Sequence, residues 1–341
     1  MKNLIECIPN FSEGQDPKVI AAIAQAIEAV DGVYLLHQDS GFAAHRTVYT
    51  FAGEASSVIE AAYQVIAVAH EQIDMRKHQG EHPRIGACDV CPFVPISGIS
   101  IEELVPLVNA LAKRLHREFK IPIHFYEENA SSPFRKNLAR HRVGNYEALK
   151  KRLLSKEWPA DLGAEFHPRF GAMVLGVRDF LVAYNINLNT DDALIAQEIA
   201  YDLRELGRPM QVVQGKKTFK AGRLKFVKAI GWYIEDFKKA QVSINLTNYK
   251  KTPLHEVFET TKEIAEDYQV KVTGSELIGL IPKDALVEAG GFYLANRDAT
   301  EAEKIQSSIK ALGLDELLPF EPQKRILEYC IEAKVDEKRT Y

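Results

Sequence analysis

The sequence contains little cysteine or tryptophan, with four and two residues among 341. Four cysteines in a chain of this length do not form the dense disulfide framework of small secreted domains. No apolar run approaches the roughly 18 residues of a membrane-spanning helix. Glu6 interrupts the N-terminal segment before the apolar core of a signal peptide could form. We therefore expect a cytoplasmic protein with reduced cysteines.

An excess of charge of one sign is also absent. Lysine and arginine number 43 against 47 aspartates and glutamates, which gives a formal net charge of −4 at pH 7. That balance offers no electrostatic basis for binding nucleic acid or an anionic membrane, and we expect neither as a partner. The 46% hydrophobic fraction is that of an ordinary globular protein. The length predicts two domains or subdomains.

Hydrophobic periodicity in the first half predicts alternating strands and helices. Asp16 and Pro17 mark the start of the first helix, because aspartate caps helices and proline suits the first helical position. The expected elements are a strand at 4–9, a helix at 17–31, strands at 33–37 and 47–51, a helix at 55–74, and a strand at 90–96. This β-α-β-β-α-β order is the ferredoxin-like pattern, and a helix at 101–118 and a strand at 121–125 extend it.

The second half repeats this order. The expected elements are a strand at 180–188, a helix capped by Thr190 and ended by Gly207, a hairpin of 224–233 with 240–248, a helix at 254–267 and a strand from 270. Helices for packing or oligomerisation are expected after Thr300 and at 322–333. We therefore predict an α/β fold, an α+β sandwich of two tandem ferredoxin-like βαββαβ subdomains, at 1–178 and 179–341.

Two strands of the second half, 185–188 and 243–246, have nearly the same sequence. They are the first and third strands of the predicted unit, which lie side by side in a ferredoxin-like sheet. Alternation puts their apolar residues on one face and uncharged polar residues on the other. The polar face is either a solvated sheet surface or one wall of a ligand groove between the sheets of the two subdomains.

The loop at 78–86 is the richest chemical feature of the chain, with two histidines, a carboxylate and an arginine. Gly80 and Pro83 disfavour a helix there, so its histidines do not form a helical metal-binding pair. His82 is a candidate for acid–base work, and Asp39 at the end of an early strand is the carboxylate best suited to orient it, ahead of Glu81. Alternatively, His82 is an exposed loop residue without a catalytic role.

Four arginines lie in or beside chemically rich segments: Arg46, Arg84, Arg169 and Arg178. Arginine binds carboxylates with two parallel hydrogen bonds, which favours an acidic small-molecule substrate. Each arginine could equally be a surface ion-pair partner.

The segment at 162–172 joins the two halves and combines glycines with aromatic and charged residues. It is either a plain linker or a hinge that contacts a ligand, and its composition favours the hinge. The pair Cys88 and Cys91 has the spacing of half a zinc site, but the ligand set is incomplete and we expect structural cysteines.

Several ordered blocks make the chain similar to glutamate formimidoyltransferases, also called formiminotransferases. The blocks are at 6–14, 46–51, 73–75, 80–86, 89–93, 181–188 and 241–247. The resemblance implies transfer of the formimino group of N-formimino-L-glutamate to N5 of tetrahydrofolate in histidine degradation. It also implies tetrahydrofolate as co-substrate without a metal, a homodimer, and no cyclodeaminase activity because the chain ends at Tyr341.

The resemblance and the residue patterns above together assign roles to particular residues. His82 falls on the family's catalytic histidine, and Asp39 is expected to support it. Substrate-binding residues are expected to be His45, Arg46, Arg84 and Arg178. The folate-contacting segment is expected to comprise Gly163, Ala164, Glu165, Phe166, His167, Pro168, Arg169, Phe170, Gly171 and Ala172. Two alternatives stay open: formyl transfer from N-formylglutamate, and a non-catalytic folate-binding protein.

Overall fold

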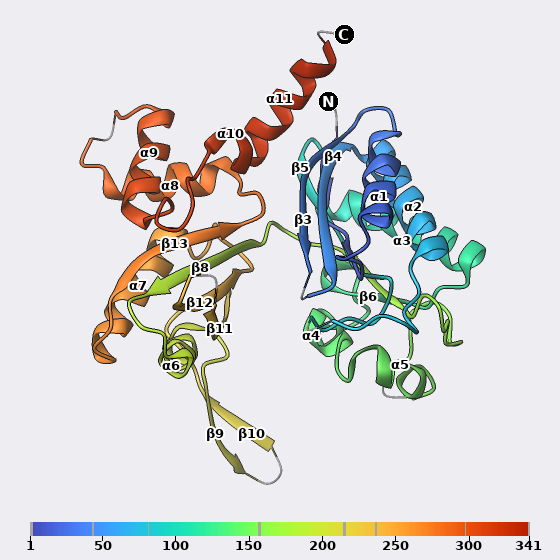
Figure 1. The fold of residues 1–341 in the computed structure, drawn as a ribbon, viewed down its shortest axis with the longest axis horizontal. Coiled ribbons are helices and arrows are strands. Elements are labelled where there is room, and N and C mark those ends of the chain that lie inside the picture. Colours follow the sequence, from blue (N-terminus) through green and yellow to red (C-terminus); the bar gives the residue numbers. More distant parts are fainter. Residues whose placement is uncertain are drawn as a thin grey trace. The chain divides into compact units, whose positions relative to one another are not determined.

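The computed structural model describes residues 3–42, 44–80, 82–155, 158–213, 216–235, 237–296 and 298–339. The chain forms a mixed α/β structure that divides into two compact units, Met1–Asp179 and Phe180–Tyr341. Figure 1 shows the two units coloured along the sequence. Within the described ranges, no helix is both long and apolar enough to cross a membrane.

The first unit contains one mixed sheet. Its elements are β1 (Leu4–Cys7), β2 (Asn10–Phe11), α1 (Pro17–Glu28), β3 (Val33–Gly41), β4 (Arg46–Glu54), α2 (Ala55–Gln72), β5 (Cys88–Ser97), α3 (Ile101–Phe119), β6 (Ile123–Phe125), α4 (Leu138–His141), α5 (Asn145–Leu153) and β7 (Met173–Val177). β1 and β2 both pair with β4 and β5, β3 pairs with the outer side of β4, and β7 lies parallel between β5 and β6. Helices α1, α2 and α3 cover one face (Figure 1) and share an apolar core with the sheet.

Local signals explain where these helices begin. The side chain of Asp16 accepts a hydrogen bond from the backbone of Lys18, and Pro17 is the first residue of α1, as predicted. Ser100 and Glu103 form a reciprocal capping box at the start of α3. These caps satisfy backbone N–H groups that have no partner inside the helix.

The second unit contains a four-stranded antiparallel sheet and a separate hairpin. Its elements are β8 (Val182–Leu188), α6 (Ala193–Leu203), β9 (Arg208–Val213), β10 (Lys216–Lys220), β11 (Val227–Ile234), β12 (Lys239–Leu246), α7 (Leu254–Asp267), β13 (Val272–Ile278), α8 (Lys283–Tyr293), α9 (Glu301–Leu312), α10 (Pro322–Arg325) and α11 (Leu327–Arg339). The sheet order is β11-β12-β8-β13. Helices α6 and α7 bury their apolar faces in the core of this unit.

The two near-identical strand segments are direct neighbours, as predicted. Asn185 pairs with Ser243, and Asn187 pairs with Gln241. Part of their polar face is closed within the unit, because Gln241 donates to Asn187 at 2.7 Å and Asn187 donates to Glu316 at 2.6 Å. Asn187 and Gln241 are fully buried, so this part of the face is not the solvated surface that one alternative predicted.

Three sequence-based assignments in the second half are wrong. Asp192, not Thr190, caps α6, because its carboxylate accepts from Leu194 while Thr190 accepts from Asp192. The helix ends at Leu203, four residues before Gly207, and Leu206 is exposed. The tail helix predicted at 322–333 is two helices, α10 and α11, which separate at Ile326.

The segment at 162–172 does not join the units. It leads directly into β7, the strand between β5 and β6, and the boundary between the units lies at Asp179 and Phe180. The prediction of a hinge here is therefore wrong. The mixture of glycines, aromatics and charges that favoured a hinge belongs to a segment packed within one unit. A Cβ at Gly171 would lie 2.2 Å from the carbonyl oxygen of Ile85.

Candidate active site

The loop between α2 and β5 is fastened to the segment that precedes β7. The backbone N–H of Ala87 donates to Phe170 at 2.7 Å, and that of Ala172 donates to Ile85 at 3.0 Å. Further back, Met75 donates to Arg169 at 2.9 Å. The loop that carries the two histidines is thus held at several points by backbone hydrogen bonds.

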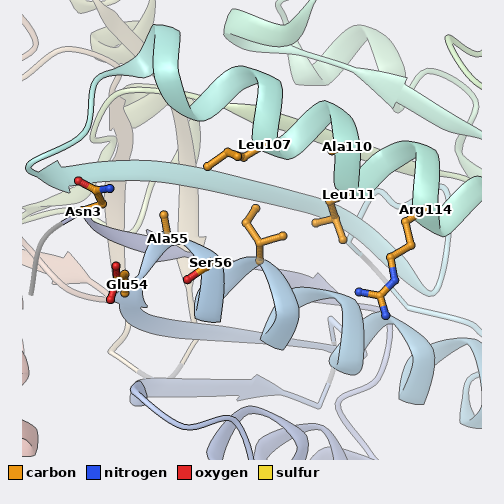
Figure 2. A pocket seen from close by; sticks show the side chains of 9 residues that line it. Asn3, Glu54, Ala55, Ser56, Leu107, Ala110, Leu111 and Arg114 are labelled. Carbon is orange, nitrogen blue, oxygen red and sulfur yellow. The ribbon is translucent and has the colours of Figure 1, made fainter.

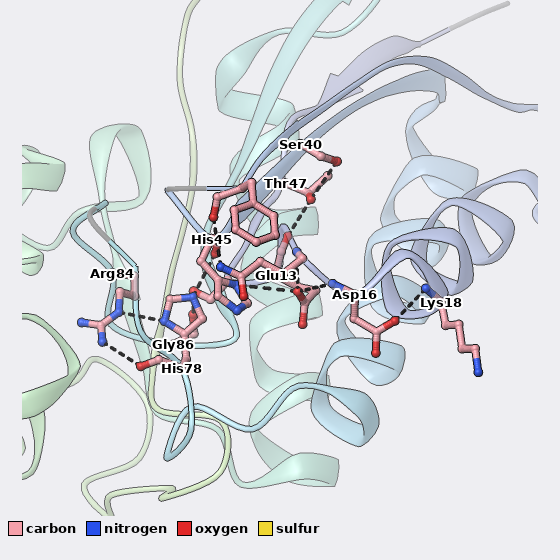
Figure 3. Close-up of polar contacts among 12 residues, drawn as sticks. Glu13, Asp16, Lys18, Ser40, His45, Thr47, His78, Arg84 and Gly86 are labelled. Carbon is pink, nitrogen blue, oxygen red and sulfur yellow. Dashed lines mark hydrogen bonds and ion pairs between the residues drawn. The ribbon is translucent and has the colours of Figure 1, made fainter. Parts of the chain in front are cut away.

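His78 has a fixed tautomer in which it shapes the loop. Arg84 Nε donates to His78 Nδ1 at 3.1 Å, and a guanidinium can only donate. The ring proton of His78 is therefore on Nε2, which donates to the carbonyl oxygen of His45 at 2.9 Å. Figure 3 shows Arg84 and His78 joined in this way. Burial lowers the pKa of His78, which keeps the ring neutral.

Arg84 is committed to its own protein. Its two terminal nitrogens donate to both carboxylate oxygens of Glu147 at 2.9 and 2.7 Å, and its side chain is buried. The backbone N–H of Tyr146 donates to the carbonyl oxygen of Arg84, which ties the start of α5 to the loop. In this structure Arg84 organises the loop, and its expected role in substrate binding stays a prediction.

His82 is in contact with Arg46, the first residue of β4. One terminal nitrogen of Arg46 lies against the ring of His82, 2.8 Å from Nδ1 and in contact with Nε2. The proton is on Nδ1, which donates to the carbonyl oxygen of Pro83 at 2.8 Å. In the neutral imidazole Nε2 then carries the lone pair.

The electrostatics around His82 keep the ring neutral. Burial and the charges of Arg46 and Arg142 lower the pKa of His82 to about 4. Burial also lowers the pKa of Arg46 to about 10, and the charge of Arg142 acts in the same direction. Two guanidinium groups thus lie near one unprotonated imidazole, an arrangement that can bind an anion beside a base.

Asp89 connects this centre to Arg142, and sequence reasoning missed both residues. Asp89 is 1% exposed. One of its oxygens accepts from the backbone of Ile85 at 2.9 Å, and the other accepts from Arg142 Nε at 2.9 Å. A carboxylate at the start of a buried strand is a signal of a buried ion pair, because Asp is almost never fully buried alone.

The remaining predicted site residues lie around this centre without joining it directly. Asp39 is exposed in β3, opposite Val48, and no hydrogen bond or ion pair joins it to His82 among the described residues. His45 has a left-handed backbone and its Nδ1 lies 3.6 Å from Glu13 (Figure 3). Arg178 follows β7 and donates to the carbonyl oxygen of Asp179. Glu81 lies outside the described residues.

The segment at 163–172 contacts the loop and α5. Phe166 packs against Tyr146, and Tyr146 donates to the carbonyl oxygen of Pro168. Phe170 is fully buried, and His167 accepts from its backbone N–H at 3.0 Å. Residues 164, 165, 168 and 169 are exposed. The aromatic residues of this segment therefore pack within the first unit, and binding of folate by the segment stays a prediction.

The cysteines at 88 and 91 are buried in β5. Cys91 Sγ lies 3.5 Å from Cys7 Sγ of the neighbouring strand β1. Over the described ranges, no group of three or more His, Cys, Asp or Glu side chains is arranged to hold a metal ion.

A cavity of about 380 Å³ lies elsewhere in the first unit, between α2 and α3. Figure 2 shows its apolar wall, which includes Leu107 and Leu111, and Arg114 at one end. Arg114 forms an ion pair with Glu60. None of the predicted site residues lines this cavity, and the candidate active site is the centre formed by His82, Arg46, Asp89 and Arg142.

These features define a protein of two mixed α/β units, the first of which holds a neutral, half-buried histidine flanked by arginines. Two family models match the chain: the N-terminal subdomain of the formiminotransferase domain over residues 4–178, and the formiminotransferase domain over residues 183–332. The chain belongs to the formiminotransferase family, as the sequence blocks indicated.

Named relatives agree with this assignment. The chain is 44% identical over 299 residues to the glutamate formimidoyltransferase of Streptococcus pyogenes serotype M1, with 87% of this chain and 95% of that protein covered. It is 40% identical over 294 residues to the glutamate formimidoyltransferase of Thermoplasma acidophilum, with 86% of this chain and 92% of that protein covered. It is 45% identical over 335 residues to the formimidoyltransferase-cyclodeaminase of Rattus norvegicus, covering 97% of this chain but only 60% of that longer protein.

Proposed function

We propose that the chain transfers the formimino group of N-formimino-L-glutamate to N5 of tetrahydrofolate, giving 5-formiminotetrahydrofolate and L-glutamate in histidine degradation. The observation that carries this proposal is the neutral imidazole of His82 beside the guanidinium of Arg46. Membership of the family and the names of its bacterial members support the choice of substrates. Tetrahydrofolate is the co-substrate in this proposal.

His82 supplies the proton transfers of this reaction. N5 of tetrahydrofolate attacks the formimino carbon and forms a new C–N bond in a tetrahedral intermediate. Nε2 of His82 accepts the proton that N5 loses and gives it to the glutamate nitrogen, whose bond to carbon then breaks. Arg46 and Arg142 bind carboxylates of the glutamate portion and hold the carbon near the attacking nitrogen, which lowers the entropic cost of reaction.

Several finer features belong to the same proposal. The strand order β11-β12-β8-β13 supports a ferredoxin-like second unit, and the order of β3, β4, β1 and β5 supports a ferredoxin-like core in the first. A homodimer, a folate groove between the two sheets and folate contact by 163–172 stay predictions from the family resemblance. Orientation of His82 by Asp39 stays a prediction from the residue pattern.

The transferase assay with wild-type protein tests the function. Tetrahydrofolate is incubated with N-formimino-L-glutamate or with N-formyl-L-glutamate, and the folate product is followed by absorbance and mass. Turnover of the formimino donor alone is the expected result. Preference for the formyl donor would show that N-formyl-L-glutamate is the substrate. Binding of folate without turnover of either donor would show that the protein binds folate without catalysing the transfer.

His82→Ala tests the catalytic assignment within that assay. Loss of a general acid–base group lowers kcat by roughly 10²–10⁴-fold. Because the proposal places His82 at the reacting nitrogen and not in a folate contact, the affinity for tetrahydrofolate is expected to change little. His255→Ala is a suitable control, because His255 lies in α7 of the second unit and its ring stacks on Phe292. An unchanged kcat in His82→Ala would refute the role.

A further inference from the structure

Glu13 is a carboxylate beside the candidate active site that holds no guanidinium. Two other carboxylates near the site are both engaged, because Asp89 binds Arg142 and Glu147 binds Arg84. Across the part of the chain that the structure describes, no ion pair joins Glu13 to a lysine or an arginine. Its negative charge is therefore free to meet a cationic group of a ligand.

The backbone around Glu13 is packed between two segments that carry the site. Ser12, the preceding residue, donates from its hydroxyl group to the carbonyl oxygen of Gly86, at the end of the loop between α2 and β5, at 2.8 Å. Gly14, the following residue, lies against the start of β4, because a Cβ at Gly14 would be 2.6 Å from the backbone nitrogen of Arg46. Glu13 is thus held beside both the histidine-bearing loop and Arg46.

The carboxylate of Glu13 is fixed at one oxygen and open at the other. Oε1 accepts from the backbone N–H groups of Gln15 at 2.8 Å and Asp16 at 2.9 Å (Figure 3). The same oxygen lies 3.6 Å from His45 Nδ1. Oε2 has no hydrogen-bond partner among the described residues, and 14% of the side chain is exposed. A charge held in this way discriminates between ligands more strongly than a mobile charge in water.

We propose that Oε2 of Glu13 binds the terminal nitrogen of the formimino group, and that this contact makes the enzyme prefer N-formimino-L-glutamate over N-formyl-L-glutamate. The inference rests on the proposed function of the site, and it makes Glu13 a specificity-determining residue. It names the chemical class that the site selects, which is a cationic amidine rather than a neutral amide.

The two donors present opposite groups to this carboxylate. The formimino group is an amidine, a strong base that carries an extra proton at neutral pH, so its terminal nitrogen is a cationic hydrogen-bond donor. A charge-assisted hydrogen bond of this kind is roughly twice as strong as a neutral one. The formyl group has a carbonyl oxygen at the same position, and its lone pairs would face those of the carboxylate. Glu13 therefore attracts one donor and repels the other.

The contact with Glu13 can persist through the whole transfer. N5 of tetrahydrofolate attacks the amidinium carbon, and the proton that N5 loses passes through His82 to the glutamate nitrogen, whose bond to carbon breaks. The terminal nitrogen stays on the transferred carbon, and the product again carries the positive charge of an amidinium. Glu13 thus binds the same nitrogen in donor and product.

Asp39 is the other acidic residue predicted near the site, and it is less suited to this role. It is exposed on β3, opposite Val48. Water screens an exposed carboxylate, so its contact with a cation contributes little to specificity. Glu13 is partly buried and is held by two backbone N–H groups, which favours Glu13 as the residue that distinguishes the donors.

The test compares kcat/KM for the two donors in the wild type and in Glu13→Gln. Glutamine keeps an oxygen that accepts from the two backbone N–H groups and replaces Oε2 by an uncharged NH₂ group. We expect kcat/KM for the formimino donor to fall roughly 10–100-fold, the worth of a hydrogen bond to a charged group. For the formyl donor it is expected to stay the same or rise, because the new NH₂ group can donate to the formyl oxygen.

Glu28→Gln is the matched control, because Glu28 is exposed at the end of α1, and its ratio of kcat/KM for the two donors is expected to equal that of wild type. An unchanged ratio in Glu13→Gln would overturn the inference. So would an equal fall for both donors, since Glu13 would then only support the fold. A change of the ratio in Asp39→Asn but not in Glu13→Gln would assign the role to Asp39 and overturn it as well.

Isothermal titration calorimetry of each donor without tetrahydrofolate separates this inference from the proposed function. If the wild type binds the formimino donor more tightly than the formyl donor, Glu13→Gln loses that preference, and neither donor is turned over, the function fails while the recognition stands. If the formimino donor is turned over and Glu13→Gln keeps the preference, the recognition alone fails. If neither donor is bound or turned over, both fail.

Discussion

Asp89 is the residue on which both the His82 loop and Arg142 depend. It is buried, accepts from the backbone of Ile85 and neutralises the guanidinium of Arg142. In Asp89→Asn the amide keeps the size but not the charge. Removing one charge of a buried pair costs about 3–5 kcal/mol, so we expect a large fall in the free energy of unfolding and loss of activity.

Urea denaturation at pH 7, followed by circular dichroism, measures this effect. Asp267→Asn is the control, because Asp267 pairs with Arg223 on the surface, where 71% of the aspartate side chain is exposed. We expect its midpoint to stay close to that of wild type. Equal midpoints for the two variants would show that Asp89 does not stabilise the site.

At the scale of elements, the loop and the segment before β7 meet at two glycines. Gly86 and Gly171 form an isolated backbone bridge, and Gly171 has a φ of +81°. A Cβ at Gly171 would meet the carbonyl oxygen of Ile85 at 2.2 Å, so the two strands of chain would have to separate. We expect Gly171→Ala to cost about 2 kcal/mol or more and to lower kcat, because the loop loses its support.

Gly279→Ala is the matched control for this prediction. Gly279 also has a positive φ, of +74°, but a Cβ there meets nothing within 4 Å. Gly279→Ala therefore lowers the free energy of unfolding only by the backbone penalty of about 1 kcal/mol. Thermal unfolding and the transferase assay compare the two variants. If both lose the same stability, the close approach at Gly171 contributes nothing.

At the scale of the whole molecule, the two units are expected to differ in their sensitivity to acid. His124 and His141 are buried in the first unit, where burial lowers the pKa of His124 well below its ordinary value and that of His141 to about 4. In the unfolded chain both titrate near pH 6.5. As the pH falls below 6.5, the unfolded chain binds protons that the folded unit does not, so stability falls. His141 alone accounts for about 2 kcal/mol between pH 8 and pH 5.

The two tryptophans allow each unit to be followed separately. Trp158 packs beside His141 in the first unit, and Trp232 lies on β11 in the second. Trp232→Phe leaves Trp158 as the fluorescent reporter of the first unit, and Trp158→Phe leaves Trp232 as the reporter of the second. Urea denaturation of both variants is followed by fluorescence at pH 8 and pH 5. The first unit is expected to lose more stability at pH 5. A loss confined to the second unit would contradict this prediction.

Local signals predicted most of the longer elements, and the repeated strand sequence predicted that β8 and β12 are neighbours. The helix at 254–267 has the predicted bounds, because its apolar period is regular and Pro253 precedes it. β7 was not predicted, because its five residues are all buried and carry no alternation of apolar and polar residues. The β9–β10 hairpin and α8 were not predicted either.

The same holds for the candidate site: short sequence patterns predicted its loop, but they did not predict the contacts between residues far apart in the sequence. The helix breakers around His82 correctly predicted a loop, and the family blocks marked the histidine. Nothing local indicates that Arg142 meets Asp89, which lies 53 positions earlier, or that Arg46 rather than Asp39 contacts His82. Those contacts depend on which strands become neighbours, and a single sequence does not encode that pairing in any short pattern.

The place of β7 in its sheet has a consequence for synthesis on the ribosome. β5 and β6 are made first, but β7 pairs with both and is the last strand of the sheet to emerge. Until it emerges, β5 exposes an unpaired hydrophobic edge, a feature that promotes aggregation of nascent chains. The same strand follows the segment that fastens the His82 loop. The nascent chain therefore completes its sheet and its candidate catalytic loop in a single late step.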